Sequence, residues 1–282
     1  MYGLATWTGI PGELLDGFDQ GGPDSSLVSK EWLAEHIQIG PLGAAYPTPT
    51  PMFIMEGDTL ATLFILQNGL NSPENPTWGG WGGRYAHSDV STGVNHYGDA
   101  ADNVTGVNGQ PYKSNHATIW RWREGYQNDF AGRMQWTLSD RYEDANYAPV
   151  VVVNNTCGPD PFHANVPAGS TVLVDASATY DPDVNNTLTF QFFQYREVNA
   201  RQWTPSLNDV PILNFTLLEG SNGSKALFSF PTADIACVDS LTRIPTDPCR
   251  EFHVILEVVD NGTPKLRNYR RIVFQLTNGT AI

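Results

Sequence analysis

Two short segments of this 282-residue chain carry the side chains best suited to chemistry. The first is Glu56-Gly57-Asp58, which follows the apolar run Met52 to Met55 and precedes a helical pattern from Thr59 to Gln67. In open α/β sheets, ligands bind beyond the carboxyl ends of strands, so this acidic pair could coordinate a hard cation or hold a hydroxyl group. A structural alternative stands beside it, because Asp58 can simply be the N-cap of the helix that begins at Thr59.

The second segment combines aromatic rings with glycine. Four glycines accompany Trp78 and Trp81, and Arg84 and Tyr85 follow directly. So much glycine excludes a stable helix and predicts a loop whose backbone can approach a ligand closely. The rings could stack on the apolar faces of sugars, and Arg84 could bind hydroxyl groups. We therefore predict a substrate-binding set of Trp78, Trp81, Arg84, Tyr85 and Glu56, although core packing explains at least one tryptophan equally well.

Other chemistries lack their motifs. The chain has no GxSxG elbow, P-loop, HExxH, dinucleotide fingerprint or CxxC pair, and its six histidines show no metal-ligand spacing. Its net charge of −14 disfavours nucleic acids and anionic bilayers, and it favours neutral or cationic ligands such as sugars. No run approaches the roughly 18 apolar residues of a membrane span, and the first residues lack the pattern of a signal peptide.

Helices dominate the first half of the sequence. Residues 29 to 38 are predicted to form a helix capped by Ser29, with Val28, Trp32, Leu33 and Ile37 on its apolar stripe. A longer helix is predicted over residues 117 to 138, because apolar side chains recur there at spacings of three and four. That stripe consists of Ile119, Trp122, Tyr126, Phe130 and Met134.

The second half is typical of a seven-stranded, immunoglobulin-like sandwich. The predicted strands cover residues 150–153, 171–174, 188–196, 212–217, 226–230, 252–259 and 271–276. Residues 252 to 258 alternate, with Phe252, Val254, Leu256 and Val258 on one face and His253 on the other. The last two strands are therefore predicted to be half-buried neighbours. Residues 1–141 are predicted to form an α/β domain, 142–149 a linker and 150–282 the all-β sandwich.

Two features point to an extracellular, oxidising environment. Seven Asn-X-Ser/Thr sequons indicate a glycosylated protein, although polar loops also produce sequons by accident. They begin at Asn103, Asn154, Asn185, Asn214, Asn222, Asn261 and Asn278. Cys237 and Cys249 flank a Pro-rich loop that a disulfide could close, which leaves Cys157 free or paired elsewhere.

Several motifs together resemble the cellulose-binding protein family that has a nucleoside-hydrolase-like domain. They are Gly40-Pro41-Leu42-Gly43-Ala44-Ala45-Tyr46-Pro47, Met55-Glu56-Gly57-Asp58-Thr59, Asn68-Gly69-Leu70, Gly79 to Tyr85, Ala117 to Trp122, Val172 to Ser177 and Asp181-Pro182-Asp183. The resemblance implies a secreted protein in which an α/β hydrolase-like domain precedes an immunoglobulin-like domain.

The same resemblance implies that part of the catalytic apparatus is missing. Nucleoside hydrolases begin with an Asp-rich strand end that binds calcium, and this chain has no such segment. Residues 1–141 are therefore expected to be only the C-terminal portion of the hydrolase-like domain. Asp58 matches the family's late calcium ligand, whereas Gly57 stands where the hydrolases have a histidine. Calcium is expected only in a full-length form.

Two functions follow from these observations. The first is a secreted protein that binds polysaccharide, such as cellulose, or a small neutral glycoside. The alternative is a calcium-dependent hydrolase of N-glycosyl bonds, inactive in this truncated form, with Asp58 as a metal ligand and Glu56 near a hydroxyl group. No catalytic residue is assigned, and the sequence does not determine whether the chain is an enzyme.

Overall fold

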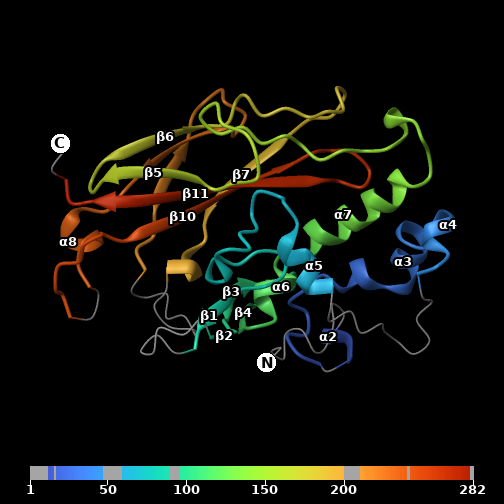
Figure 1. The fold of residues 1–282 in the computed structure, drawn as a ribbon, viewed down its shortest axis with the longest axis horizontal. Helices are drawn as coiled ribbons and strands as arrows, with labels where there is room; N and C mark the ends of the chain where they lie inside the picture. The colour runs from blue at the N-terminus through green and yellow to red at the C-terminus, as the bar shows by residue number, and fades with distance from the viewer. Residues whose placement is uncertain are drawn as a thin grey trace.

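The computed structural model describes residues 12–15, 17–46, 59–88, 96–199, 210–239 and 242–279. A first part with short helices and two small hairpins lies against a second part built from two β-sheets (Figure 1). The elements of the first part are α2 Gly12–Leu15, η1 Ser25–Val28, α3 Lys30–His36, α4 Gly40–Gly43, α5 Thr59–Ile65, η2 Pro76–Trp78, β1 Tyr85–His87, β2 Tyr97–Asp99, β3 Asp102–Thr105, β4 Pro111–Ser114, α6 Ala117–Trp120, α7 Arg123–Trp136 and η3 Tyr142–Asp144. No helix among these or later described residues is long and apolar enough to cross a membrane.

The predicted helices of the first part are found with shorter bounds. Helix α3 begins where expected, and the Ser29 hydroxyl accepts a hydrogen bond from the Trp32 N–H at 3.1 Å, which confirms the predicted cap. Helix α5 matches the pattern that begins at Thr59. The strand predicted at Met52 to Met55 lies outside the described residues.

The helix predicted over residues 117 to 138 is broken into α6 and α7. Trp122 leaves helical geometry at φ −103° and ψ 5°, beside Arg121, whose side chain reaches the buried Asp102 at 2.8 Å. The apolar stripe also divides. Ile119, Trp122 and Tyr126 pack toward the β-sheet, whereas Phe130 and Met134 pack with Leu33 and Ile37 of α3. Apolar spacing alone could not reveal this break.

The described residues of the second part form seven strands in two sheets. Its elements are β5 Phe162–Pro167, β6 Thr171–Asp175, β7 Thr189–Gln194, η4 Arg196–Asn199, β8 Asn214–Leu217, β9 Lys225–Ser229, α8 Ala233–Ala236, β10 Glu251–Val259 and β11 Arg267–Thr277. One sheet has the order β5-β11-β10-β7, in which only β5 and β11 are parallel, and the other has the order β6-β9-β8. The predicted first strand at residues 150–153 makes only isolated bridges, and β5 was not predicted.

A single apolar core lies between the two sheets. Phe192 and Phe274 of the four-stranded sheet contact Phe228 of the three-stranded sheet, with ring centroids 5.8 and 5.9 Å apart. Phe252, Val254, Leu256 and Val258 of β10 are all fully buried in this core, as the alternation predicted. A disulfide joins Cys237 to Cys249, and Cys157 is exposed.

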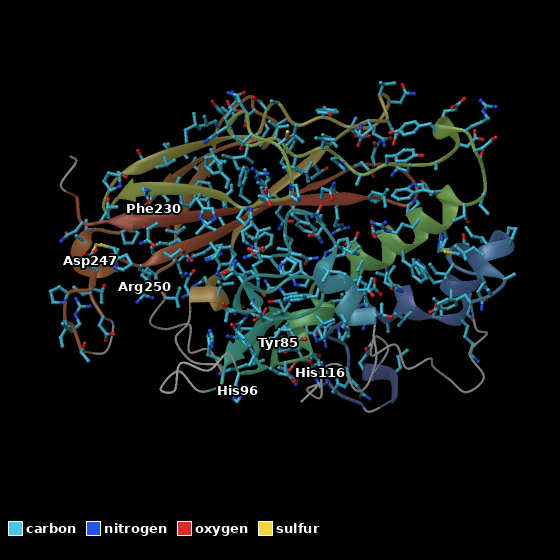
Figure 2. All side chains as sticks on the ribbon, in the orientation of Figure 1. Tyr85, His96, His116, Phe230, Asp247 and Arg250 are labelled. Carbon is cyan, nitrogen blue, oxygen red and sulfur yellow. A yellow bond between two sulfur atoms is a disulfide. The ribbon has the colours of Figure 1, made fainter. Side chains whose placement is uncertain are left out.

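The prediction that β10 and β11 are half-buried is wrong. Their opposite face is covered by the first part, where Ile255 and Tyr269 pack against Trp81, Trp122 and Tyr126. Figure 1 shows the helices and hairpins of the first part beneath the four-stranded sheet, and Figure 2 shows side chains filling the space between them. The sheet is therefore the middle layer of the molecule.

Backbone hydrogen bonds attach the first part to the edge of β11. Arg271 N–H donates to the Gly69 carbonyl and Tyr269 N–H to the Asn68 carbonyl, both at 2.9 Å. Residues 68–70 thus pair with the stretch of β11 that precedes its pairing with β5. The fully buried Arg271 guanidinium also donates to the carbonyls of Leu70 and Gly79.

Candidate functional site

The glycine-rich loop from Trp78 to Tyr85 packs inward. Trp81 is 1% exposed, its indole N–H lies 3.3 Å from the Tyr269 hydroxyl, and its ring meets Tyr126 edge to face. Asn71 fixes the loop by accepting a hydrogen bond from the Trp81 N–H at 2.9 Å. Trp81 therefore presents no ring face to a sugar in this structure, and the core-packing alternative describes it.

Trp78 is half-buried against the middle sheet. Its ring contacts His253 of β10 edge to face at 4.7 Å, and the Arg271 guanidinium lies 5.7 Å from its centroid. The carbonyl of the neighbouring Gly79 accepts a hydrogen bond from Arg271 at 2.8 Å. The contacts of Trp78 are thus contacts within the protein that hold the loop to the sheet.

Arg84 belongs to a buried ionic cluster. It is 4% exposed and donates from Nε to the Asp102 carboxylate at 2.7 Å, and this carboxylate also binds Arg121 and the Tyr195 hydroxyl. Burial opposes the charge on Arg84, but Asp102, Tyr195 and Glu197 together outweigh burial and raise the pKa of the guanidinium. The cluster links the first part to the sheet, because Tyr195 directly follows β7.

Of the remaining predicted site residues, Tyr85 packs against a neighbouring ring, and the two acidic residues lie outside the described chain. Tyr85 is half-buried, meets Phe64 edge to face at 6.0 Å, and lies below the four-stranded sheet in Figure 2. Glu56 and the predicted metal ligand Asp58 lie outside the described residues. Within the part of the chain that the structure describes, no group of three or more His, Cys, Asp or Glu side chains could hold a metal.

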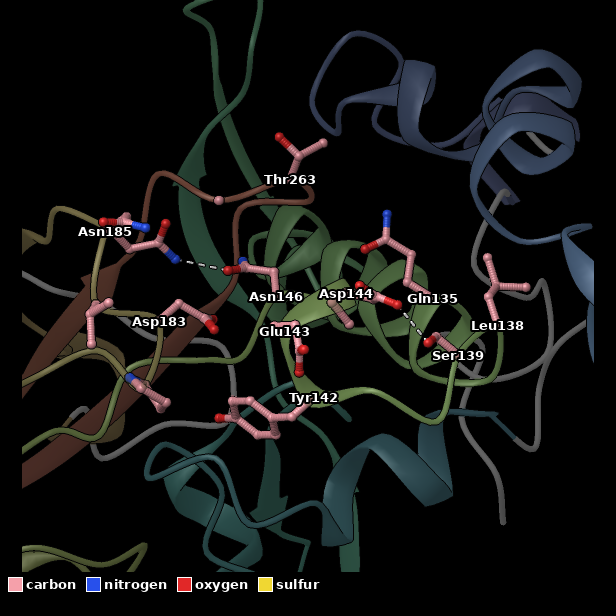
Figure 3. Close-up of a pocket in the computed structure, with 15 residues that line it drawn as sticks. Gln135, Leu138, Ser139, Tyr142, Glu143, Asp144, Asn146, Asp183, Asn185 and Thr263 are labelled. Carbon is pink, nitrogen blue, oxygen red and sulfur yellow. Dashed lines mark hydrogen bonds between the residues drawn. The ribbon is translucent and has the colours of Figure 1, made fainter.

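A groove lies where the end of α7 and the predicted linker meet two loops of the second part (Figure 3). Its volume is about 730 Å³. The lining residues are Gln135, Leu138, Ser139, Tyr142, Glu143, Asp144, Ala145, Asn146, Pro182, Asp183, Val184, Asn185, Asn186, Gly262 and Thr263. Seven of these fifteen residues carry carboxylates or amides, and none of the fifteen is basic. Such side chains offer many hydrogen-bonding groups to a hydroxylated ligand.

Three near-parallel aromatic rings support one side of the groove. Tyr142 stacks on Tyr147 with centroids 3.9 Å apart and an interplanar angle of 2°, and Tyr147 stacks on Trp136 at 5.4 Å and 13°. Tyr142 is nevertheless 52% exposed. It is a lining residue of the groove, so a large, rigid, amphipathic ring is available there to a ligand.

Hydrogen bonds fix the predicted linker to the loops of the sandwich. The buried Asn146 side chain donates to Asp260 and to the Pro264 carbonyl, and it accepts from Asn186, each at 2.8 Å. Tyr147 N–H donates to Asp183 at 2.7 Å. The segment is therefore held in place before any ligand arrives, which reduces the entropic cost of binding.

The electrostatics of the groove keep it anionic and its phenol neutral. Backbone hydrogen bonding at Glu143 and the Arg141 guanidinium lower the pKa of the Glu143 carboxyl. Partial burial, with Asp183, Tyr147 and Asp181 nearby, raises the pKa of Tyr142. Tyr142 thus keeps its proton at neutral pH and can donate a hydrogen bond, while the carboxylates can accept from hydroxyl groups.

Sequence reasoning did not identify this groove, because its residues come from a predicted linker and from loops distant in the sequence. The available signal was Tyr142 and Tyr147 in a stretch interpreted as a linker, close behind Trp136 at the end of the predicted helix. The Asp181-Pro182-Asp183 motif also lies beside it, but sequence spacing does not show that this loop folds back onto residues 142–147.

Comparisons with known proteins agree with the motif resemblance. Residues 1–85 match the family described as cellulose-binding Sde182, nucleoside hydrolase-like domain, and residues 171–276 match the cellulose-binding protein Sde0182, C-terminal domain. The two matches together cover about two thirds of the chain, so both segments are similar to the cellulose-binding Sde182 proteins. The fold is thus nucleoside-hydrolase-like in its first part and rich in β-strands in its second.

Among solved structures, the chain is similar over most of its length to the following protein. It is a nucleoside hydrolase-related hypothetical protein from Saccharophagus degradans that is associated with carbohydrate metabolism, with 29% identity and a TM-score of 0.65. The match covers 91% of this chain and 55% of that protein, so the chain spans about half the length of this relative. No curated protein matches the chain.

Proposed function

We propose that this chain binds polysaccharide, with cellulose or a related β-glucan as the ligand, and that the groove at Tyr142 is its binding site. The observation that carries the proposal is the half-exposed Tyr142 ring beside carboxylates and amides in a groove without basic residues. A pyranose ring has apolar faces that suit an aromatic side chain and hydroxyl groups that suit the polar lining. The matches to cellulose-binding families support the same ligand class.

We also propose that the protein is secreted and that its second part is an immunoglobulin-like domain. Seven strands divided into sheets of four and three support an immunoglobulin-like domain. The disulfide and the sequons support secretion. Calcium-dependent hydrolysis of N-glycosyl bonds, with Asp58 as a metal ligand and Glu56 nearby, stays a prediction for a longer form.

A depletion assay with insoluble cellulose tests the groove. Tyr142→Ala is expected to weaken binding roughly 2- to 13-fold, because aromatic stacking contributes about 0.5–1.5 kcal/mol. Tyr142→Phe keeps the ring and should retain most of the affinity.

Tyr180 provides the matched control, because it is 56% exposed and is not a lining residue of the groove. Tyr180→Ala should bind cellulose like the unmodified protein. Equal binding by Tyr142→Ala and Tyr180→Ala would remove the groove as the site, and no binding by the unmodified protein would remove cellulose as the ligand.

A further inference from the structure

One glycosylation sequon lies on the groove itself. Asn185-Asn186-Thr187 begins at a lining residue of the groove, and Figure 3 labels Asn185 among the lining residues, on the same side as Asp183. Asn186 N–H donates to the Asp183 carbonyl at 2.9 Å, so Val184 and Asn185 occupy the two central positions of a tight turn. Val184 is 92% exposed and Asn185 is also exposed. The acceptor amide therefore projects from a surface turn.

The other sequons differ from this one in burial or in place. Asn103 and Asn154 are half-buried, whereas Asn214, Asn222, Asn261 and Asn278 are exposed. None of these six lines the groove. Asn214 is especially useful for comparison, because it lies on strand β8 of the three-stranded sheet and is followed by an exposed Thr216.

We propose that Asn185 is an N-glycosylation site and that its glycan covers the groove. The Asn185 side-chain nitrogen attacks C1 of an oligosaccharide carried on a polyisoprenyl diphosphate. A bond from Nδ2 to C1 forms, the bond from C1 to the diphosphate oxygen breaks, the polyisoprenyl diphosphate leaves, and the amide loses one proton. The exposed turn accommodates the product, because no packed side chain must move to admit it.

The glycan has a consequence for ligand access. A bulky oligosaccharide on a residue that lines the groove competes for the space and the hydrogen-bonding groups that a polysaccharide would use. The turn is fixed on both sides, by Asn186 bonded to Asn146 and by Thr187 N–H bonded to Asn261, so it cannot easily carry the glycan away. This second half of the inference rests on the proposed function, whereas modification of Asn185 does not.

Secretion of the whole chain from a eukaryotic host tests both halves. Peptide mapping after enzymatic removal of N-glycans identifies each modified asparagine by the mass change that accompanies its conversion to Asp. We expect Asn185 to be modified, and the glycosylated protein to bind cellulose several-fold more weakly than the enzymatically deglycosylated protein.

Two Thr→Ala variants complete the design. Thr187→Ala destroys the Asn185 sequon and should bind like the deglycosylated protein, whereas Thr216→Ala destroys the Asn214 sequon and should not change cellulose binding. An unmodified Asn185, with or without modification of Asn214, overturns the site. If cellulose binding is unchanged after the Asn185 glycan is lost, the glycan does not cover the groove. If Asn185 is modified but the protein binds no cellulose in any form, the proposed function is refuted and the glycosylation site stands.

Discussion

Gly69 is the position at which the contact between the two parts can be tested most directly. It has a φ of +80°, and a Cβ atom there would lie 1.9 Å from the Tyr269 carbonyl oxygen. Carbon and oxygen atoms normally approach no closer than about 3.3 Å, so Gly69→Ala must separate the two backbones by more than about 1 Å. The hydrogen bonds from Tyr269 to Asn68 and from Arg271 to Gly69, now 2.9 Å long, cannot survive that shift.

Gly109 offers a matched control for the backbone conformation. Its φ is +78°, but nothing lies within 4 Å of a Cβ placed there. Gly109→Ala should therefore lower the free energy of unfolding by only about 1–2 kcal/mol, the cost of holding a residue with a Cβ in the left-handed conformation. Gly69→Ala should cost that amount plus about 1–3 kcal/mol for each of two lost, buried hydrogen bonds, which gives an excess of about 2–6 kcal/mol.

Urea unfolding followed by tryptophan fluorescence measures this difference, because Trp81 is buried close to the same contact. The expected result is a much lower unfolding midpoint for Gly69→Ala than for Gly109→Ala. If the free energies of unfolding of the two variants agree within about 0.5 kcal/mol, then residues 68–70 do not pair closely with β11 and the reasoning fails.

Two further predictions concern stability. Burial lowers the pKa of His253 from 6.5 to about 4, with Arg271 and His163 adding to the effect and Glu251 opposing it; the folded state therefore resists protonation. The contribution of neutral His253 to the free energy of unfolding should be complete above pH 6.5, and the free energy should fall by up to roughly 3 kcal/mol as the pH drops toward 4. Urea titrations at several pH values measure this fall, and His253→Gln should make it smaller. Ser29→Ala removes the cap of α3 and should lower the free energy of unfolding by about 1 kcal/mol. Ser221→Ala, at a serine outside any helix, should lower it by less. Equal losses in the two variants would contradict the capping role of Ser29.

The sequence predicted the elements whose signals are local. Helix α3 could be placed from Ser29 and an apolar stripe, and β10 from strict alternation, since capping and side-chain periodicity act within a few residues. Strand β5 was missed because its residues carry weak strand propensity, including Pro167, and its pairing partner lies about 110 residues away. The groove depends entirely on such distant contacts.

The polar residues of β10 and β11 explain why these strands were predicted to have one exposed face. His253 of β10 and Arg271 of β11 lie on the face opposite the apolar core between the sheets, a pattern that normally indicates one wet face. Here both are buried, because that face meets backbone carbonyls and aromatic rings of the first part.

A buried guanidinium is tolerated only when its donors are satisfied, and Arg271 satisfies them with the carbonyls of Leu70 and Gly79. The same polar side chains that mimic a solvent face are thus the ones that recognise the first part. It follows that the second part expressed alone would expose to water the apolar side chain of Ile255 and the ring of Tyr269, beside an Arg271 that has lost its carbonyl partners. The two parts are therefore expected to fold as one cooperative unit despite their separate family matches.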